Sequence, residues 1–254
     1  MNIKVPKVEI ILLLLSLVLI FSLSANLFLI DKAVYYYKSL NLLRLDPLEH
    51  KTEKDNKVNI SAEEGSPVII LYGDSRIAQW HPKLLIPGAT IINKGLEGQT
   101  TAQLRLRLES DVIANSPDMV IFQAGINDLK TIGLFPKHKE AIITNCKQNL
   151  EFIIKQISNQ NIDIVVLTIF PNGKPELIRS WLWSDEIDNG VVLVNNLLLK
   201  MSNSKIHVIN ADNFLKAVKY IRPHFKKDML HLNQAGYQQL NDQLQPNVLR
   251  LLSK

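Results

Sequence analysis

The sequence of 254 residues has almost no cysteine: Cys146 is the only one, so no disulfide can form within the chain and the fold cannot depend on one. Cys146 lies in an apolar periodic stretch, where we expect a buried and unreactive thiol. The sequence also lacks internal repeats, low-complexity tracts and a strong excess of one charge. Because the formal net charge is only +5 and the lysines and arginines are scattered, we expect no nucleic-acid partner.

One long apolar run is present, over residues 8–30. As a helix these residues would rise about 34 Å, which is enough to span a bilayer. Lys4 and Lys7 before the run, and the small residues Ser22 and Ser24 inside it, also fit a cleaved signal peptide, but the run continues past Ser24 and so favours an uncleaved anchor. We predict a single-pass membrane protein with a transmembrane anchor, or uncleaved signal, in residues 1–30 and its large domain on the extracytoplasmic side, periplasmic or outer.

Residues 31–66 are expected to form a juxtamembrane segment and a tether, because the part from Pro47 onward is polar and rich in turn-forming residues. Residues 67–254 alternate two kinds of pattern. Compact apolar runs typical of buried parallel strands occupy residues 68–72, 90–93, 119–123, 164–168 and 206–209. Helical patterns occupy residues 101–114, 139–159, 188–201 and 234–252. This alternation predicts an α/β domain around a parallel sheet, with its chemistry at the carboxyl ends of the strands.

Ser75 directly follows the first predicted strand, in a turn that Gly73 makes easy. A serine hydroxyl is a poor nucleophile unless a neighbouring base removes its proton. Of the six histidines, His231 is the best placed base, because it precedes a helix and has Asp228 three residues before it to accept from one ring nitrogen. His224, Asp228 and His231 could also be read as metal ligands, but no further cluster of ligands supports that interpretation.

Acyl chemistry also needs hydrogen-bond donors for the developing oxyanion. Gly95 closes the second predicted strand, where a glycine lets a backbone N–H come close to a substrate. Asn127 follows the third strand and could offer its side-chain amide. With the backbone N–H of Ser75 these residues would supply three donors.

Four segments together, Gly73-Asp74-Ser75, Asn93-Lys94-Gly95, Gly125-Ile126-Asn127-Asp128 and Asp228-Met229-Leu230-His231, resemble blocks I, II, III and V of the SGNH (GDSL-like) hydrolase family in their order and spacing. The resemblance covers residues 68–252. It implies a flavodoxin-like three-layer α/β/α sandwich with a parallel sheet, and ester hydrolysis without a metal or other cofactor. The roles that it implies are Ser75 as nucleophile, His231 as base, Asp228 as its orienting partner, and Ser75, Gly95 and Asn127 as the oxyanion hole.

The resemblance implies a serine esterase acting on a small acyl ester, and we expect an acetyl group on an envelope or extracellular carbohydrate. A lysophospholipase or other lipid esterase, or a polysaccharide O-acyltransferase, would use the same residues, and a non-enzymatic polysaccharide-binding protein would use only the cleft. No Gly-x-Ser-x-Gly elbow surrounds Ser75, which argues against the larger α/β-hydrolase fold. The family pattern has leucine after the serine, whereas this chain has Arg76, which could contact substrate or pair with a carboxylate.

Overall fold

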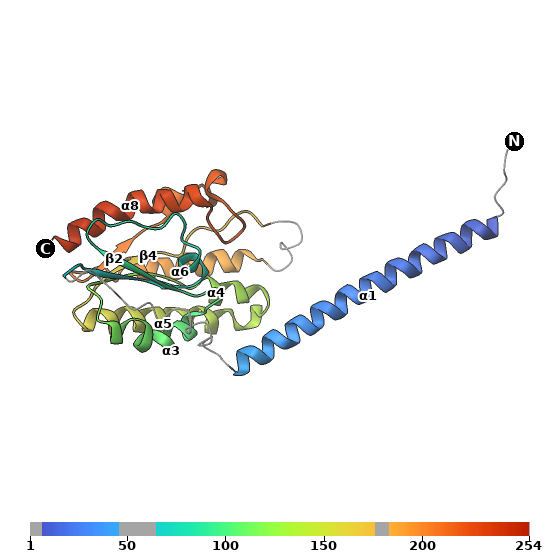
Figure 1. Cartoon of the computed structure of the whole chain (residues 1–254), viewed down its shortest axis with the longest axis horizontal. Helices are drawn as coiled ribbons and strands as arrows, with labels where there is room; N and C mark the ends of the chain where they lie inside the picture. Colours follow the sequence, from blue (N-terminus) through green and yellow to red (C-terminus); the bar gives the residue numbers. More distant parts are fainter. Residues whose placement is uncertain (1–6, 46–64, 176–182, 254) are drawn as a thin grey trace. The chain divides into compact units, whose positions relative to one another are not determined.

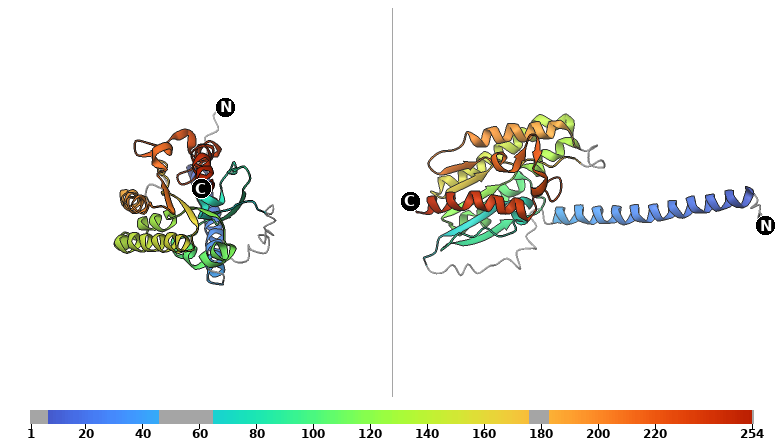
Figure 2. Two further views of the ribbon diagram at one scale, coloured as in Figure 1. Left: turned by 90° about the vertical axis from the view of Figure 1, so that its left-hand side faces the viewer. Right: turned by 90° about the horizontal axis from the view of Figure 1, so that it is seen from above.

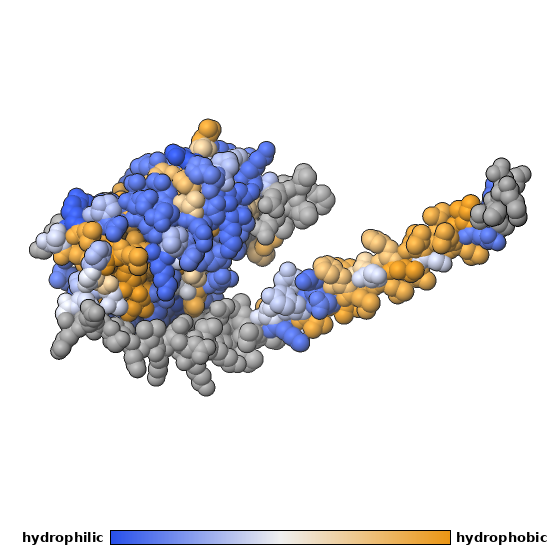
Figure 3. Space-filling model, turned by 45° about the horizontal axis from the view of Figure 1, so that its top comes forward, coloured by the Kyte–Doolittle hydropathy of each residue, from blue (hydrophilic) through white to orange (hydrophobic). Residues whose placement is uncertain are grey.

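The computed structural model describes residues 7–45, 65–175 and 183–253. Its internal contacts divide the chain into two units, Met1–Val58 and Asn59–Lys254. In the described part of the first unit, helix α1 (Lys7–Leu45) exposes large apolar side chains from Val8 to Leu40, and the face of it seen in Figure 3 is mostly hydrophobic, with hydrophilic residues toward its ends. Within its segment Lys7–Leu40, a window of 18 residues has a mean hydropathy of 2.6, so the length and composition of this helix suffice to cross a membrane.

The expected apolar helix is therefore present, and it is longer than the apolar run alone. It continues past Ile30 to Leu45, over the juxtamembrane part of residues 31–66, whereas the tether predicted from Pro47 onward lies almost entirely outside the described residues. The sequence gives a reason: residues 31–45 contain neither glycine nor proline, and Pro47 is the first residue that disfavours a helix.

The second unit is built on a five-stranded parallel sheet, which confirms the predicted α/β class. Its strands are β1 (Val68–Gly73), β2 (Thr90–Gly95), β3 (Met119–Gln123), β4 (Asp163–Leu167) and β5 (Ile206–Ile209). They pair in the order β2-β1-β3-β4-β5, with every ladder parallel. This is a doubly wound order in which the chain switches direction at β1, so a crevice is expected between the carboxyl ends of β1 and β3.

Alternate residues of each strand point to opposite faces of the sheet and build two separate cores. In β1, Ile70 and Tyr72 join the core covered by α3 (Thr101–Asp111), α5 (Lys139–Asn159) and α6 (Asp185–Leu199), while Ile69 and Leu71 join the core covered by α8 (Gln234–Leu252). Figures 1 and 2 show α8 on the opposite side of the sheet from α3 and α5. Every residue of both cores belongs to the second unit, which therefore has a complete hydrophobic interior of its own.

Several short elements were not predicted as such from the sequence, because two to four residues are too few to show a helical or strand period. They include the single-turn helices α2 (Ser75–Ala78), α4 (Ile126–Leu129) and α7 (Asp212–Leu215), the 3₁₀ turns η2 (Ile113–Asn115), η3 (Lys130–Gly133), η4 (Pro136–His138) and η5 (Pro223–Phe225), and the hairpin of β6 (Lys216–Ala217) and β7 (Tyr220–Ile221). Two of these turns, α2 and α4, follow directly on β1 and β3 and carry residues singled out above.

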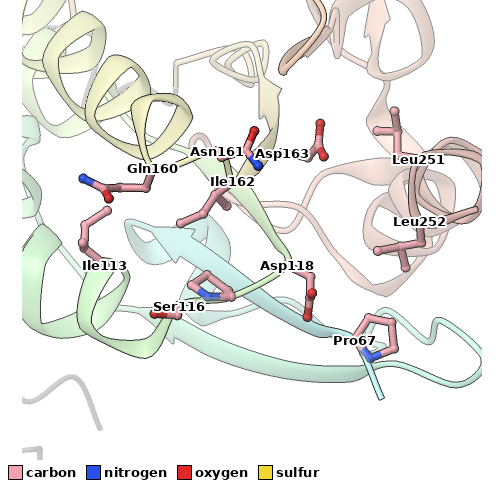
Figure 4. Close-up of a pocket in the computed structure, with 11 residues that line it drawn as sticks. Pro67, Ile113, Ser116, Asp118, Gln160, Asn161, Ile162, Asp163, Leu251 and Leu252 are labelled. Carbon is pink, nitrogen blue, oxygen red and sulfur yellow. The ribbon is translucent and has the colours of Figure 1, made fainter. Parts of the chain in front are cut away.

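The amino edge of the sheet carries a hollow of about 450 Å³ (Figure 4). Pro67, Asp118 and Ile162, which line it, each directly precede a strand. The Asp118 carboxylate there already accepts the backbone N–H of Val68 at 2.7 Å. None of the residues predicted to take part in chemistry lines this hollow, so the candidate site lies at the other, carboxyl edge of the sheet.

Candidate active site

Ser75 is the first residue of α2, immediately beyond the end of β1. A β-carbon at Gly73 would lie 2.0 Å from the carbonyl oxygen of Gln123 on the neighbouring strand, so only glycine allows β1 to end so close to β3. Asp74 then caps the turn, because its Oδ1 accepts the backbone N–H of Arg76 at 2.9 Å. The result is a serine that is only 8% exposed and is held in a fixed turn at the rim of the sheet.

The structure brings together the three residues predicted to act in proton transfer. Ser75 Oγ lies 3.0 Å from Nε2 of His231, and Nδ1 of His231 lies 2.8 Å from Oδ2 of Asp228. Oδ1 of Asp228 accepts the backbone N–H groups of Leu230, at 2.7 Å, and of His231, at 2.9 Å. The Asp228 carboxylate therefore does two things: it stabilises the turn from Asp228 to His231, and it orients the imidazole of His231.

Hydrogen bonding around Asp228 determines its charge and the tautomer of the histidine. Burial acts to raise the pKa of Asp228, but the hydrogen bonds from the N–H of Leu230 and from the ring and backbone of His231 outweigh it and lower that pKa below its usual range. An ionised carboxylate only accepts hydrogen bonds, so Nδ1 of His231 carries the proton that faces it. Nε2 is then the acceptor for the hydroxyl proton of Ser75, which is the arrangement that a general base requires.

The three predicted oxyanion donors follow neighbouring strands at the same edge, since Gly73 of β1 is in register with Gly95 on one side and with Gln123 on the other. Their hydrogen-bonding states differ. The N–H of Ser75 has no acceptor among the described residues. The N–H of Gly95, by contrast, donates to Oδ1 of Asn93 at 2.8 Å, so an oxyanion would have to compete with an internal acceptor.

Asn127 is 4% exposed, and both ends of its amide are held. Its Nδ2 donates to the carbonyl of Gln99 at 3.0 Å, and its Oδ1 accepts from Nζ of Lys130 at 2.6 Å. One of the two Nδ2 hydrogens is thus engaged and the other is available to a ligand. Sequence reasoning missed Lys130, although a residue three positions after Asn127 on a helical turn is a natural neighbour of it.

Asp128, the residue after Asn127, accepts from the N–H and hydroxyl of Thr101, at 2.9 and 2.6 Å, and so fixes the start of α3. Burial raises the pKa of this carboxyl above its usual range. For the alternative metal set, the structure shows no group of three or more histidine, cysteine or acidic residues able to hold an ion within residues 7–45, 65–175 and 183–253.

A hydrogen-bonded serine, histidine and aspartate at the carboxyl edge of a parallel sheet is an arrangement that acylhydrolases of the α/β class use. Residues 62–239, more than half of the chain, match the model of the GDSL-like Lipase/Acylhydrolase family. The chain belongs to this family of ester-bond hydrolases, which confirms the resemblance that its four segments carry.

Individual relatives are more distant. An acetylxylan esterase from Geobacillus stearothermophilus is 33% identical over 85 residues, which make up 33% of this chain and 39% of that enzyme. The alignment thus spans well under half the length of this curated relative. Among solved structures, a Streptococcus pneumonia protein provisionally described as a platelet activating factor has a TM-score of 0.65 at 21% identity, covering 85% of this chain and 98% of its own. A GDSL-like lipase from Bacteroides thetaiotaomicron has a TM-score of 0.65 at 18% identity, covering 80% and 98%. These two likenesses show the shared fold.

Proposed function

We propose that the protein is a serine esterase that removes a small acyl group, an acetyl group in the first instance, through an acyl-enzyme on Ser75. The observation that carries the proposal is the continuous series of hydrogen bonds from Ser75 Oγ through the His231 ring to the Asp228 carboxylate. Each bond in it is of ordinary length, and the ionised carboxylate sets the tautomer that leaves Nε2 ready to take a proton.

The reaction follows from this geometry in two halves. Ser75 Oγ attacks the ester carbonyl carbon while its proton moves to Nε2 of His231; the alcohol then leaves with that proton, and an acyl-serine remains. Water attacks the acyl-serine in the same way, its proton passing through Nε2 to the departing Ser75 oxygen. In both halves the negative charge of the tetrahedral oxygen is met by the N–H of Ser75 and by the second Nδ2 hydrogen of Asn127, and a donor of this kind typically contributes about 3 to 4 kcal/mol.

The preference for acetyl and for carbohydrate is supported by the local similarity to an acetylxylan esterase, a protein whose name states both the acyl group and the sugar. The region of similarity is short, so this part of the proposal goes further than membership of the family. An acetylated envelope or extracellular polysaccharide is the substrate class that we propose.

The proposed location is the outer side of a membrane, with α1 as an uncleaved anchor and the second unit in the extracytoplasmic space. Support comes from the length and apolar surface of α1. Protease treatment of sealed cells tests the placement: digestion of the second unit is expected without lysis, whereas protection until lysis would place the unit in the cytoplasm.

The activity is tested with the full chain in mild detergent, on p-nitrophenyl acetate, a longer-chain p-nitrophenyl ester and an acetylated xylo-oligosaccharide. We expect turnover of the acetyl esters and its loss in Ser75→Ala. A matched control is Ser110→Ala, because this serine lies on α3 and donates only to the carbonyl of Arg107. Rates that rise with acyl chain length would indicate a lipid esterase, transfer that requires a sugar acceptor would indicate an acyltransferase, and equal rates for Ser75→Ala and the parent would refute the mechanism.

A further inference from the structure

Arg76 directly follows the nucleophile and is the largest side chain that is fully buried in the described structure, with 0% of it exposed. Burial rules out the first role considered for it, contact with substrate. The second role, direct pairing with a carboxylate, is not what the structure shows either: among the described residues, every hydrogen-bond acceptor of its guanidinium is a carbonyl oxygen. Burial lowers the pKa of Arg76, and the carboxylates of Asp74 and Asp228 oppose this shift through space, without a hydrogen bond from the guanidinium. A charged group placed in this way requires another explanation.

The three acceptors of the guanidinium belong to two separate segments that border the site. Its Nε donates to the carbonyl of Leu230 at 2.9 Å. Its Nη1 and Nη2 donate to the carbonyl of Phe170, at 3.3 Å, and to the side-chain oxygen of Asn172, at 3.2 Å. Cζ of Arg76 also lies over the ring of Phe170, 5.3 Å from its centroid, in a cation–π contact.

In the sequence Leu230 lies between Asp228 and His231, two residues after the aspartate and directly before the histidine. Arg76, the residue after the nucleophile, therefore contacts Leu230, the residue before the base, although 154 positions separate the two in the chain. The same base-carrying loop is fastened to the segment after β4 by the N–H of Gly173, which donates to the carbonyl of Met229 at 2.8 Å. Through its hydrogen bonds Arg76 connects three segments: its own turn after β1, the segment after β4 and the loop that carries His231.

We propose that Arg76 is a positioning residue. Its guanidinium holds the loop that carries His231 in the position at which Nε2 lies within hydrogen-bond distance of Ser75 Oγ. The inference rests on the proposed function, since it assigns a role in the reaction of that same site. A guanidinium is suited to the task because its donors form a rigid planar fork that reaches acceptors in several fixed directions. A lysine at the same place would keep the charge but offer one flexible ammonium.

The test uses the full chain in mild detergent and compares Arg76→Lys and Arg76→Met with the parent protein. Because the guanidinium does not touch substrate, we expect KM to stay within about threefold while kcat falls. A displacement of the base by about 1 Å costs on the order of 10²-fold in rate, and this is the loss of kcat that we expect in both variants. The rate at which diisopropyl fluorophosphate labels Ser75 should fall in parallel, since labelling depends on the same Ser75–His231 pair.

A matched control separates positioning from general loss of stability. Ile157 is fully buried in the core on the other face, near the carboxyl end of α5 and thus toward the amino edge of the sheet, so Ile157→Ala should lower the melting temperature without changing kcat per folded molecule. If Arg76→Met does not fold, Arg76→Lys and Asn172→Ala take its place. Asn172→Ala removes one hydrogen-bond acceptor of the Arg76 guanidinium, so kcat should fall while KM is retained.

The outcomes distinguish this inference from the proposed function. If kcat per folded molecule stays within about threefold of the parent in the Arg76 variants, or if only KM changes, the positioning role is refuted while the serine mechanism stands. If Ser75 of the parent is neither labelled nor needed for turnover, the proposed function fails and the role of Arg76 fails with it. Parallel loss of kcat and of labelling, with KM retained, supports the inference.

Discussion

Asp74, beside the nucleophile, provides a quantitative test of the electrostatics of the site. Its side chain is completely buried; Oδ1 accepts the N–H of Arg76, and Oδ2 has no hydrogen-bond partner among the described residues. Burial raises the pKa of this carboxyl from the usual 3.8 to about 6, although the neighbouring charge of Arg76 opposes the shift. The protonated form of Asp74 is thus favoured in the folded protein relative to the unfolded chain.

The sign of the effect on stability follows by linkage. A carboxyl group with a raised pKa in the folded state stabilises the fold fully below pH 3.8, and this contribution is lost as the pH rises through about 6. A difference of one in pKa corresponds to about 1.4 kcal/mol, so the interval from 3.8 to about 6 amounts to about 3 kcal/mol. Asn at position 74 retains an oxygen that can cap the turn but does not titrate, and so lacks this dependence on pH.

The assay is urea unfolding of the protein truncated to residues 59–254, the unit that contains both cores, for the parent and for Asp74→Asn. The quantity of interest is the difference between their free energies of unfolding at each pH from about 3.5 to 7.5, because contributions of all other titrating groups cancel in it. We expect the asparagine variant to gain about 3 kcal/mol relative to the parent across this range. A difference that stays constant, or that moves toward the parent as the pH rises, would refute the reasoning.

Three further substitutions test the site. In Asp228→Asn an amide replaces the ionised acceptor that sets the imidazole tautomer, and kcat should fall by about 10⁴-fold with KM little changed in steady-state assays. Lys130→Met removes the ammonium that donates to Oδ1 of Asn127, and we expect kcat to fall by about tenfold. Asn127→Ala removes the proposed oxyanion donor itself, and kcat should fall by about 10²- to 10³-fold. Equal losses in the two variants would contradict this ranking. In Gly95→Ala the new β-carbon would lie 2.3 Å from the backbone nitrogen of Ala78. The free energy of unfolding measured in urea should therefore fall by about 1 to 3 kcal/mol, and an unchanged midpoint urea concentration would contradict this packing.

The sequence alone predicted the sheet well, because its strands are short apolar runs, several of them rich in β-branched residues. The runs at 119–123 and 206–209 and the helices at 139–159 and 234–252 match the observed elements at both ends. Helix α6 begins three residues earlier than expected, at Asp185, because the acidic residues of its first turn favour a helix start that the apolar pattern does not reveal. Ser184 occupies the N-cap position but makes no side-chain capping hydrogen bond.

What sequence patterns could not supply are contacts between distant segments. The residue types at Ser75 and His231 signalled their chemistry, but nothing local predicts that Arg76 reaches Leu230 or that Asn93 takes the N–H of Gly95. Such contacts depend on how the loops pack after the sheet forms. For the same reason, the sequence left Arg76 with two possible roles, and its observed contacts match neither.

The topology accounts for the way in which the parts of the site converge. The connection from β1 to β2, with Trp80, Leu84 and Ile86, packs in the core on the α8 face, whereas the connection from β3 to β4 packs through α5 on the other face. The chain therefore leaves β1 and β3 toward opposite faces and opens the crevice between their carboxyl ends.

Ser75 borders this crevice from β1. The loop before α8, whose Leu232 packs in the core on the α8 face, brings Nε2 of His231 within 3.0 Å of Ser75 Oγ. Helix α4, whose apolar residues pack into the opposite core, carries Asn127 beyond the carboxyl end of β3. In the proposed mechanism the order of the strands and these connections would thus bring residues from three distant parts of the sequence to one site.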